Sequence, residues 1–301
     1  MELHQLRYFV EVVQTGSFTQ AAKRCHVTQP TLSHQIKKLE DLLGEPLLQR
    51  LKHGVLPTPL GKSFYPHAVS ILGGVRAAQE EAASFTSELK GSLHLGMIPT
   101  VAPYITPKLL KASQEASPQI TFQITEDTTE NLLAAMREGV IDVSILSLPI
   151  EGPEWQVDDL IRDEILVALP NGHPLAEKGD VSVSRCKKEP LILMKEAHCL
   201  RGQSLKICSK TGWEPEIHLV STQIDTLLAL VETGMGISFI PALARSAAAS
   251  RQIQLRPIAP ERHYRTIALT RPRQSVPTRA LLRFYETCSE VFRKKEAPSE
   301  N

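Results

Sequence analysis

Hydrophobic residues near the start of the chain recur every three or four positions, which is the spacing of one buried helix face. Three such stretches cover residues 3–13, 18–25 and 29–43. Gly16 ends the first, Ser17 with Gln20 forms a capping-box pattern before the second, and Pro30 stands near the start of the third. The short turn between the second and third stretches predicts a helix-turn-helix.

The next segment changes pattern twice. Residues 45–57 are short pieces interrupted by prolines, which is typical of a β-wing. From Pro59 the apolar positions advance in steps of four and three, close to the a/d seam of a coiled coil. The seam consists of Leu60, Phe64, Ala68, Ile71, Val75, Ala78, Ala82, Phe85 and Leu89. A single long helix with one apolar stripe needs a partner, and another copy of the chain is the simplest one.

After Gly91 apolar strands alternate with helical stretches. The expected strands lie near residues 93–98, 120–124, 143–146, 165–168, 191–193, 217–220, 237–240 and 267–269. The expected helices lie near residues 107–115, 129–137, 200–210, 224–232 and 279–292. Such alternation predicts an α/β fold with largely parallel sheets covered by helices, and its length suits two small lobes. Ligands are expected where strand ends meet helix starts.

The predicted organisation therefore has three parts. Residues 1–58 form an all-α winged helix-turn-helix that binds DNA, and residues 59–90 form a linker and dimerisation helix. Residues 91–301 form a two-lobed domain of the α/β class, whose second lobe spans about residues 163–265.

Composition excludes several classes of protein. The chain has 301 residues, 42% of them hydrophobic and 22% charged, which is typical of a globular protein. Its formal net charge is only +1, so any case for nucleic acid must be local. A signal peptide and a membrane span are not expected, which predicts a cytoplasmic protein that does not associate with membranes. Five cysteines are too few and too uneven for a disulfide framework, and neither a cofactor nor a metal is expected.

The third helix and the wing carry the polar residues that DNA recognition needs. An α-helix enters the major groove with its early residues at base edges, while flanking cations meet phosphates. The base-edge candidates are Gln29, Thr31, Ser33 and His34, and the phosphate candidates are Lys37, Lys38, Arg50 and Lys52; Pro30 is also expected on the DNA-binding face. A solvated charged face is the alternative, and the helix-turn-helix context favours DNA.

Cys199 and Cys208 form the second candidate site. Their spacing of nine matches neither a CxxC redox motif nor a paired zinc knuckle. His198 and Arg201 are cations that can lower the pKa of the Cys199 thiol, and a thiolate is oxidised to sulfenic acid, which a second cysteine condenses to a disulfide.

The predicted helix separates the two Cα atoms by ~13 Å, whereas a disulfide needs them within about 7 Å. The bond would therefore require the helix to unwind, although inert thiols remain an alternative on spacing alone. Of the other cysteines, Cys25 is expected to be buried, Cys186 to be exposed, and Cys288 to lie in the core or at the surface.

The chain resembles the LysR-type transcriptional regulators. Over the first 62 residues the resemblance rests on Ala21-Ala22, Val27-Thr28-Gln29-Pro30-Thr31-Leu32-Ser33, Ile36, Leu39-Glu40, Leu43-Gly44, Leu47-Leu48, Arg50 and Thr58-Pro59-Leu60-Gly61. Further along, His198-Cys199-Leu200-Arg201 with Gln203 and Cys208 is similar to the peroxide-sensing members of that family, as are Ile98-Pro99-Thr100 and Ile240-Pro241-Ala242. Two residues depart from the pattern: Pro57 replaces an apolar residue, and Gly202 replaces a polar one and predicts a looser helix after Cys199.

The resemblance implies roles for individual residues. Cys199 would be peroxidatic and Cys208 resolving, while Thr100 and Thr129 would hydrogen-bond peroxide or a water and His198 would orient the site. Asp142 and Arg265 would support conformational change or proton handling, and Arg201 would flank the thiol.

It also implies a periplasmic-binding-protein-like regulatory domain and a transcriptional activator that is not an enzyme. Its partners would be double-stranded promoter DNA, hydrogen peroxide, RNA polymerase and further copies in a homodimer or homotetramer. Two alternatives stay open: a regulator that binds a small organic effector between its lobes, and a thiol peroxidase with a vestigial DNA-binding head.

Overall fold

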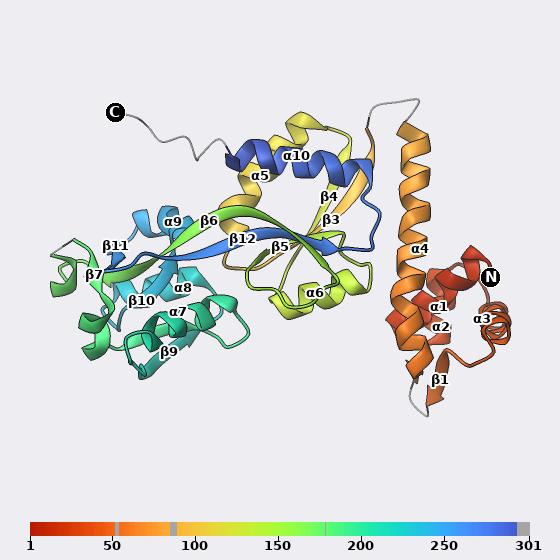
Figure 1. Cartoon of the computed structure of the whole chain (residues 1–301), viewed down its shortest axis with the longest axis horizontal. Helices are drawn as coiled ribbons and strands as arrows, with labels where there is room; N and C mark the ends of the chain where they lie inside the picture. The colour runs from red at the N-terminus through yellow and green to blue at the C-terminus, as the bar shows by residue number, and fades with distance from the viewer. Residues whose placement is uncertain (52–53, 85–88, 178, 294–301) are drawn as a thin grey trace.

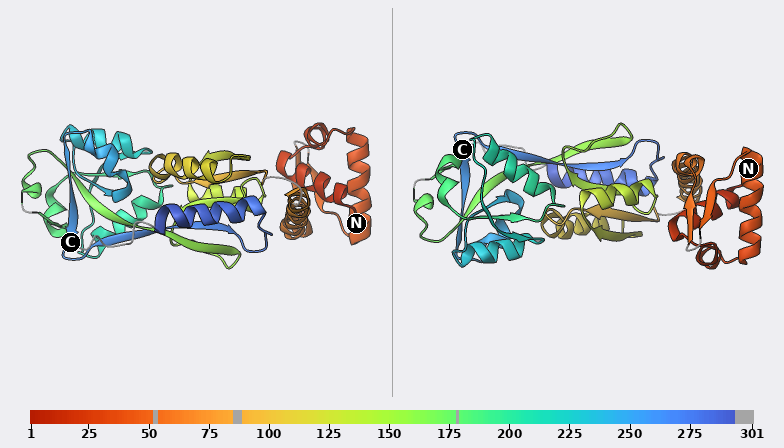
Figure 2. Two further views of the ribbon diagram at one scale, coloured as in Figure 1. Left: turned by 90° about the horizontal axis from the view of Figure 1, so that it is seen from above. Right: turned by 90° about the horizontal axis from the view of Figure 1, so that it is seen from below.

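The chain is elongated and built from three consecutive parts. The computed structural model describes residues 1–51, 54–84, 89–177 and 179–293. A small N-terminal head, the long helix α4 (Pro59–Ser84) and two α/β lobes follow one another (Figure 1). Seen from above and below, α4 is viewed end-on between the rest of the head and the first lobe (Figure 2). The helices that the structure describes include none long and apolar enough to cross a membrane.

The head is the predicted winged helix-turn-helix. Its elements are α1 (Leu3–Thr15), α2 (Phe18–Arg24), α3 (Gln29–Leu43), β1 (Leu48–Leu51) and β2 (Gly54–Pro57), with the two strands antiparallel. The Ser17 side chain accepts a hydrogen bond from the backbone N–H of Gln20, and Gly44 ends α3 in the left-handed conformation. Leu32, Ile36 and Leu39 are buried as expected, so the opposite face of α3 is left to solvent.

The apolar stripe of helix α4 is partly buried against the head and partly exposed to solvent. Ala68 is buried in the head core, whereas Leu60 and Ile71 are 39% and 38% exposed. Leu89 does not continue the stripe, because it packs against the core of the first lobe, and Phe85 lies outside the described residues. The seam predicted from the heptad spacing is therefore shorter than expected.

The two lobes share one long mixed sheet. The first lobe contains β3 (Gly91–Met97), α5 (Ala102–Ala116), β4 (Ile120–Glu126), α6 (Thr129–Arg137), β5 (Val143–Ser147) and α10 (Arg279–Arg293). The second contains β7 (Val181–Ser182), β8 (Leu191–Met194), α7 (Cys199–Ser209), β9 (Ile217–Ser221), α8 (Ile224–Glu232), β10 (Ser238–Pro241), α9 (Arg245–Ala249) and β11 (Ile253–Ala259). Strands β6 (Trp155–Pro170) and β12 (His263–Pro272) run through both lobes (Figure 1).

The expectation of largely parallel sheets is wrong for the centre of the molecule. The strand order is β4-β3-β5-β12-β6-β11-β7, and β12 is antiparallel to both of its neighbours, as is β6 to β10, β11 and β12. Only short apolar segments of β6 and β12 were visible in the sequence, because the rest of each strand is half-buried and partly polar. Those two long strands position the site described below.

A tight approach between α4 and the wing gives the first prediction. A Cβ atom at Gly61 would collide with the backbone carbonyl oxygen of Leu47. We expect Gly61→Ala to lower the free energy of unfolding of the head by about 2 kcal/mol, because neither backbone can move without disturbing the core. Urea unfolding followed by circular dichroism measures this. Gly202→Ala is the control, since its Cβ would meet nothing within 4 Å and should not destabilise.

Candidate functional site

Helix α7 holds the two candidate cysteines apart. Cys199 is its first residue and Cys208 lies in its last turn, so the helical rise separates their Cα atoms by ~13 Å. The helix packs on the second-lobe core through Leu200, Ile207 and Cys208, and the Ser204 hydroxyl donates to the Leu200 carbonyl at 2.8 Å. All five cysteines are free thiols, and Cys199 alone among them is only partly buried. The predicted helix is confirmed, with its start one residue earlier.

The Cys199 thiol lies where the two lobes meet. The Ser147 and Thr100 side chains lie beside it and act to lower its pKa, and both residues belong to the first lobe. The guanidinium of Arg265, on β12, donates from Nη1 to the Thr100 hydroxyl at 2.9 Å and from Nη2 to the Thr100 carbonyl at 3.0 Å. Its Nε donates to Asp163 Oδ2 at 2.9 Å, and both side chains are almost completely buried. A fixed positive charge therefore stands beside the thiol.

Burial nevertheless raises the pKa of the Cys199 thiol above its ordinary value. Arg265 and the hydrogen bonds from Ser147, the Leu200 backbone and Thr100 oppose this effect without overcoming it. The sequence argument that His198 and Arg201 lower the pKa is wrong. Arg201 donates to the Met194 carbonyl and pairs with Glu196, and burial lowers the pKa of His198 so that its ring is neutral near pH 7. The cation at the thiol comes from a distant strand.

Nine buried side-chain polar atoms of the described residues have no hydrogen-bond partner, and two of them belong to residues that bear on this site. These two are the Thr129 hydroxyl, at the first position of α6, and the Gln203 Oε1. The Gln203 Nε2 donates to the Ser147 hydroxyl at 2.8 Å and to the Leu148 carbonyl at 3.3 Å, which attaches α7 to the end of β5. Buried polar atoms of this kind are normally satisfied by a water or a ligand.

Asp142 lies elsewhere. It immediately precedes β5, whereas Ser147 ends that strand, so about 16 Å of extended chain separates it from the thiol. Its carboxylate pairs with Arg76 of α4 and accepts a hydrogen bond from the His94 backbone at 2.9 Å. The expected grouping of Asp142 with the thiol site is therefore corrected.

Sequence reasoning assigned no role to Ser147, Gln203 or Asp163, although the structure places all three around Cys199 and Arg265. Gln203 stood within the quoted cysteine motif, so its position was a usable signal. Ser147 ends a buried strand, which is where ligand-binding side chains are commonly found. Nothing local marked Asp163 within β6.

The remaining cysteines lie in the cores. Cys25 is buried in the head and Cys288 in the first lobe, both within the expectations. Cys186 is completely buried, so its expected exposure is wrong, and its thiol contacts the Ser182 carbonyl at 3.7 Å. The charged residues beside it point outward from a short 3₁₀ turn while Val183 and Cys186 face the core. Burial raises its pKa to about 12.

The second candidate site is the free face of α3 and the wing. Pro30, Thr31, His34, Lys37, Lys38 and Arg50 are exposed, Gln29 and Ser33 are half-buried, and Lys52 lies outside the described residues. The Arg50 guanidinium donates to the Ser33 hydroxyl at 2.7 Å and lies over the Phe18 ring at 4.3 Å. The wing cation is thus held against the exposed face of α3. Lys37 pairs with Asp41 one turn further on, at 3.1 Å.

Two family models match this chain. Residues 3–62 match the family model of bacterial regulatory helix-turn-helix proteins of the lysR family, and residues 86–293 match the LysR substrate binding domain. The chain belongs to the LysR family. Members of this family are DNA-binding transcriptional regulators and not enzymes.

This LysR-family regulator is 34% identical over 298 residues to the DNA-binding transcriptional dual regulator OxyR of Escherichia coli K12, covering 98% of this chain and 96% of the relative. It is similar to full-length OxyR from Pseudomonas aeruginosa, with a TM-score of 0.82 and 30% identity over 99% of both chains. A hydrogen-peroxide-bound Cys-to-Ser variant of OxyR from Corynebacterium glutamicum has a TM-score of 0.65 and 29% identity, covering 97% of this chain and 94% of that one. The regulator is therefore OxyR-like.

The raised pKa of Cys199 predicts how its reactivity depends on pH. Only the thiolate is nucleophilic, so alkylation by iodoacetamide should rise about tenfold per pH unit up to at least about pH 9. Mass spectrometry of the Cys199 peptide after timed alkylation of the full chain measures the rate. A plateau below about pH 8 would show instead that the resting thiol is acidified.

Proposed function

We propose that this regulator senses hydrogen peroxide by oxidation of Cys199 and formation of a disulfide with Cys208. One observation carries the proposal: the partly buried Cys199 thiol and its only partner in α7 are kept ~13 Å apart by a helix that the bond would have to unwind. Because the reduced fold cannot accommodate this bond, the reduced and the disulfide-bonded protein must have different conformations. A regulator needs two such conformations.

The chemistry needs only peroxide and the two thiols. The Cys199 thiolate attacks one peroxide oxygen, the O–O bond breaks, and the departing hydroxide takes a proton to leave as water. Cys199 is then a sulfenic acid. The Cys208 thiolate attacks the Cys199 sulfur, the S–O bond breaks, and a second water leaves as the disulfide forms. Peroxide is reduced by two electrons, and the two thiols supply them.

The residues around Cys199 suit the first step. The Thr100 hydroxyl, held by Arg265, and the partnerless Thr129 hydroxyl and Gln203 carbonyl are polar groups for a small molecule with two hydroxyls. The buried Arg265 charge favours the thiolate when it forms, and Asp163 positions Arg265. The neutral His198 ring flanks the entrance to α7 without adding charge. Because burial keeps the resting thiol protonated, deprotonation accompanies peroxide binding.

The second step depends on the stability of α7. Gly202 is exposed within the helix, and glycine destabilises a helix by about 1 kcal/mol relative to alanine. The free energy needed to unwind α7 is therefore smaller with glycine at this position than it would be with a polar residue. The apolar contacts of Leu200 and Ile207 with the second-lobe core oppose unwinding and return the helix once the disulfide is reduced.

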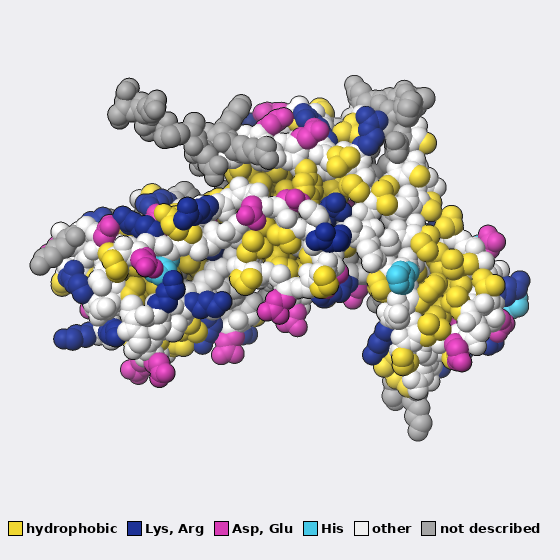
Figure 3. All heavy atoms as spheres, in the orientation of Figure 1, with side chains coloured by type: hydrophobic (Ala, Val, Ile, Leu, Met, Phe, Trp, Pro, Cys, Tyr) yellow, Lys and Arg dark blue, Asp and Glu magenta, His cyan; other side chains and the backbone are white. Residues whose placement is uncertain are grey.

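For DNA binding, we expect the first residues of α3 to contact base edges in the major groove. Arg50 of the wing and the lysines of α3, Lys37 and Lys38, would contact phosphates. A homodimer would form through α4, because the exposed Leu60 and Ile71 leave an apolar stripe uncovered, and hydrophobic side chains gather over the head and α4 in Figure 3. Two such dimers, joined through their sensor lobes, would make the tetramer that binds promoter DNA. Oxidation would then respace the heads and, through contact with RNA polymerase, activate transcription.

Three variants test the redox cycle. Mass mapping after brief peroxide exposure should find a Cys199–Cys208 disulfide in the native chain and a sulfenic acid, trapped with dimedone, in Cys208→Ser. Cys199→Ser should give neither product and should leave the DNA footprint unchanged by peroxide. A footprint that still shifted in Cys199→Ser would overturn the proposal, and a response to metabolites but not to peroxide would favour an organic effector.

Gly202→Ala separates the two chemical steps. It should strengthen α7 by about 0.5–1 kcal/mol and slow disulfide formation about two- to fivefold, because the helix must unwind for the thiols to meet. Its sulfenic acid should form at the native rate, since the Cys199 contacts are unchanged. Stopped-flow oxidation with mass spectrometric readout measures both rates. Equal disulfide rates in the two proteins would show that unwinding does not limit the second step.

The DNA face makes a separate prediction. Lys38→Ala should weaken operator binding and lower the slope of log affinity against log salt by about 1, as expected when one phosphate contact is lost. Fluorescence anisotropy over a series of salt concentrations measures the slope. Lys111→Ala, on the exposed face of α5 in the first lobe, is the control and should leave the slope unchanged.

A further inference from the structure

We propose that the turn between α6 and β5, residues 138–142, is a latch that holds the head and α4 on the first lobe and transmits the state of Cys199 to them. The coupling part of this inference rests on the proposed function. The latch itself rests on contacts within the chain.

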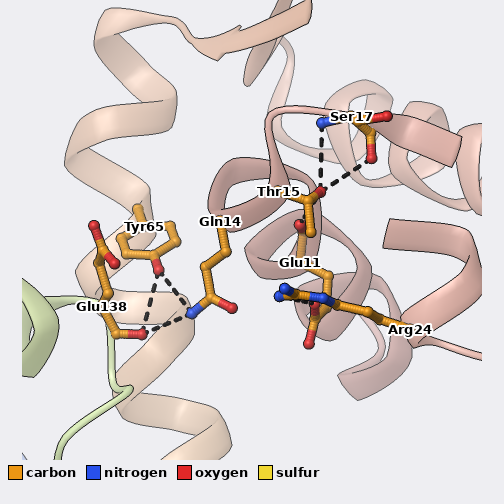
Figure 4. Close-up of polar contacts among 7 residues, drawn as sticks. All are labelled: Glu11, Gln14, Thr15, Ser17, Arg24, Tyr65 and Glu138. Carbon is orange, nitrogen blue, oxygen red and sulfur yellow. Dashed lines mark hydrogen bonds and ion pairs between the residues drawn. The ribbon is translucent and has the colours of Figure 1, made fainter. Parts of the chain in front are cut away.

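At one end of the turn, a single carbonyl receives two groups from the head and the linker helix. The Glu138 carbonyl accepts a hydrogen bond from Gln14 Nε2 of α1 at 2.9 Å and from the Tyr65 hydroxyl of α4 at 3.3 Å (Figure 4). Gln14 Nε2 also donates to the Tyr65 hydroxyl at 3.2 Å, so the three groups form a closed triangle. This triangle joins the head, α4 and the first lobe at one point.

The other end of the turn binds α4 through charge. Arg76 pairs with Asp142 Oδ1, while Asp142 Oδ2 is occupied by the His94 backbone N–H of β3. The carboxylate is therefore oriented by the first lobe before it meets Arg76. Between the two ends, Gly139 has a φ of 68°, and a Cβ there would lie 2.6 Å from Val69 of α4. The turn approaches α4 as closely as its backbone permits.

Around these contacts the interface is poorly filled. A cavity of about 1050 Å³ lies between α1, α4 and the first lobe, with Val10, Leu72, Met136 and Trp155 among its lining residues. Where packing is incomplete, few dispersion contacts oppose separation, so a small set of polar contacts determines whether the surfaces stay docked. The position of the head can therefore change without dismantling a core.

Strand β5 connects the latch to the thiol. It begins directly after Asp142 and ends at Ser147, whose hydroxyl contacts Cys199 and accepts a hydrogen bond from Gln203 of α7. All five residues of β5 are buried, and the strand pairs with β3 on one side and β12 on the other. It therefore moves as a unit. When α7 unwinds, Ser147 at one end of β5 loses its contacts with Gln203 and Cys199. The strand is then free to shift, and with it the turn at residues 138–142 at its other end.

Hydrogen exchange of the full chain tests the latch without peroxide. The amides of Gly139, Val140, Ile141 and Asp142 are all hydrogen-bonded within the first lobe, so their exchange reports opening of the turn. In the reduced protein, Arg76→Gln and Tyr65→Phe should each raise that exchange roughly two- to fivefold, the range expected for loss of one partly exposed ion pair or of one hydrogen bond. Arg137→Gln is the matched control, because Arg137 lines the same cavity but pairs with Glu154 within the first lobe. Unchanged exchange in Arg76→Gln and Tyr65→Phe would overturn the latch.

Two further measurements test the coupling. In the reduced protein, Gln203→Ala should raise exchange of residues 138–142 by a similar factor, although it lies at the far end of β5. In the native chain, peroxide should raise it as well, and should add little in Arg76→Gln, where the latch is already open. If mass mapping finds no disulfide, the proposed function fails, while Arg76→Gln and Tyr65→Phe still decide the latch and Gln203→Ala still decides whether α7 is coupled to it. If the disulfide forms and exchange at residues 138–142 stays unchanged, the coupling is wrong and the proposed function stands.

Discussion

A buried ion pair between Arg265 and Asp163 organises the region where the two lobes meet. Arg265 lies on β12 and Asp163 on β6, the two strands that run through both lobes. Asp163 also accepts a hydrogen bond from the Leu243 backbone N–H in the second lobe. Arg265 donates hydrogen bonds to the hydroxyl and the carbonyl of Thr100 in the first lobe. Burial raises the pKa of the Asp163 carboxyl despite its partner, so removal of either member would leave an uncompensated group in the interior.

The Arg265–Asp163 pair determines the charge and the hydrogen-bonding groups around the Cys199 thiol. It supplies the cation beside Cys199 and fixes the hydroxyl of Thr100, yet burial still keeps the resting thiol protonated. A protonated resting thiol is protected from slow oxidation, and a nearby fixed charge favours the thiolate once peroxide is bound. The proposed sensor therefore combines low resting reactivity with a site prepared for one small oxidant.

Helix α7 turns the chemistry into a conformational signal under the proposed mechanism. Its packing on the second-lobe core keeps the two thiols apart, while Gly202 weakens the same helix near Cys199. These opposed influences set the free-energy gap between the reduced and oxidised states. In the proposed mechanism the signal runs from α7 along β5 to the turn at residues 138–142. The cavity between the head and the first lobe leaves few packing contacts there to oppose a change in the position of the head.

Local patterns in the sequence determined much of this protein. Helical periodicity and caps located α1 to α4, because a helix face and its capping residues lie within a few positions of one another. The spacing of Cys199 and Cys208, together with the predicted helix, already showed that a bond between them requires unwinding. The family was also visible in the sequence, since its motifs are contiguous.

Only the tertiary structure decided which groups surround the thiol and where the sensor touches the head. Arg265 and Thr100 are 165 positions apart, and Gln14 and Glu138 are 124 apart, so no local period relates them. The adjacent His198 and Arg201 were a misleading guide, because side-chain direction and burial determine whether a neighbour in sequence is a neighbour in space. Asp142, which was expected to support conformational change or proton handling together with Arg265, lies at α4 instead, because the length of β5 separates it from the thiol. The pairing of Arg265 with Thr100 depends on how β12 runs through both lobes, which the sequence pattern did not specify.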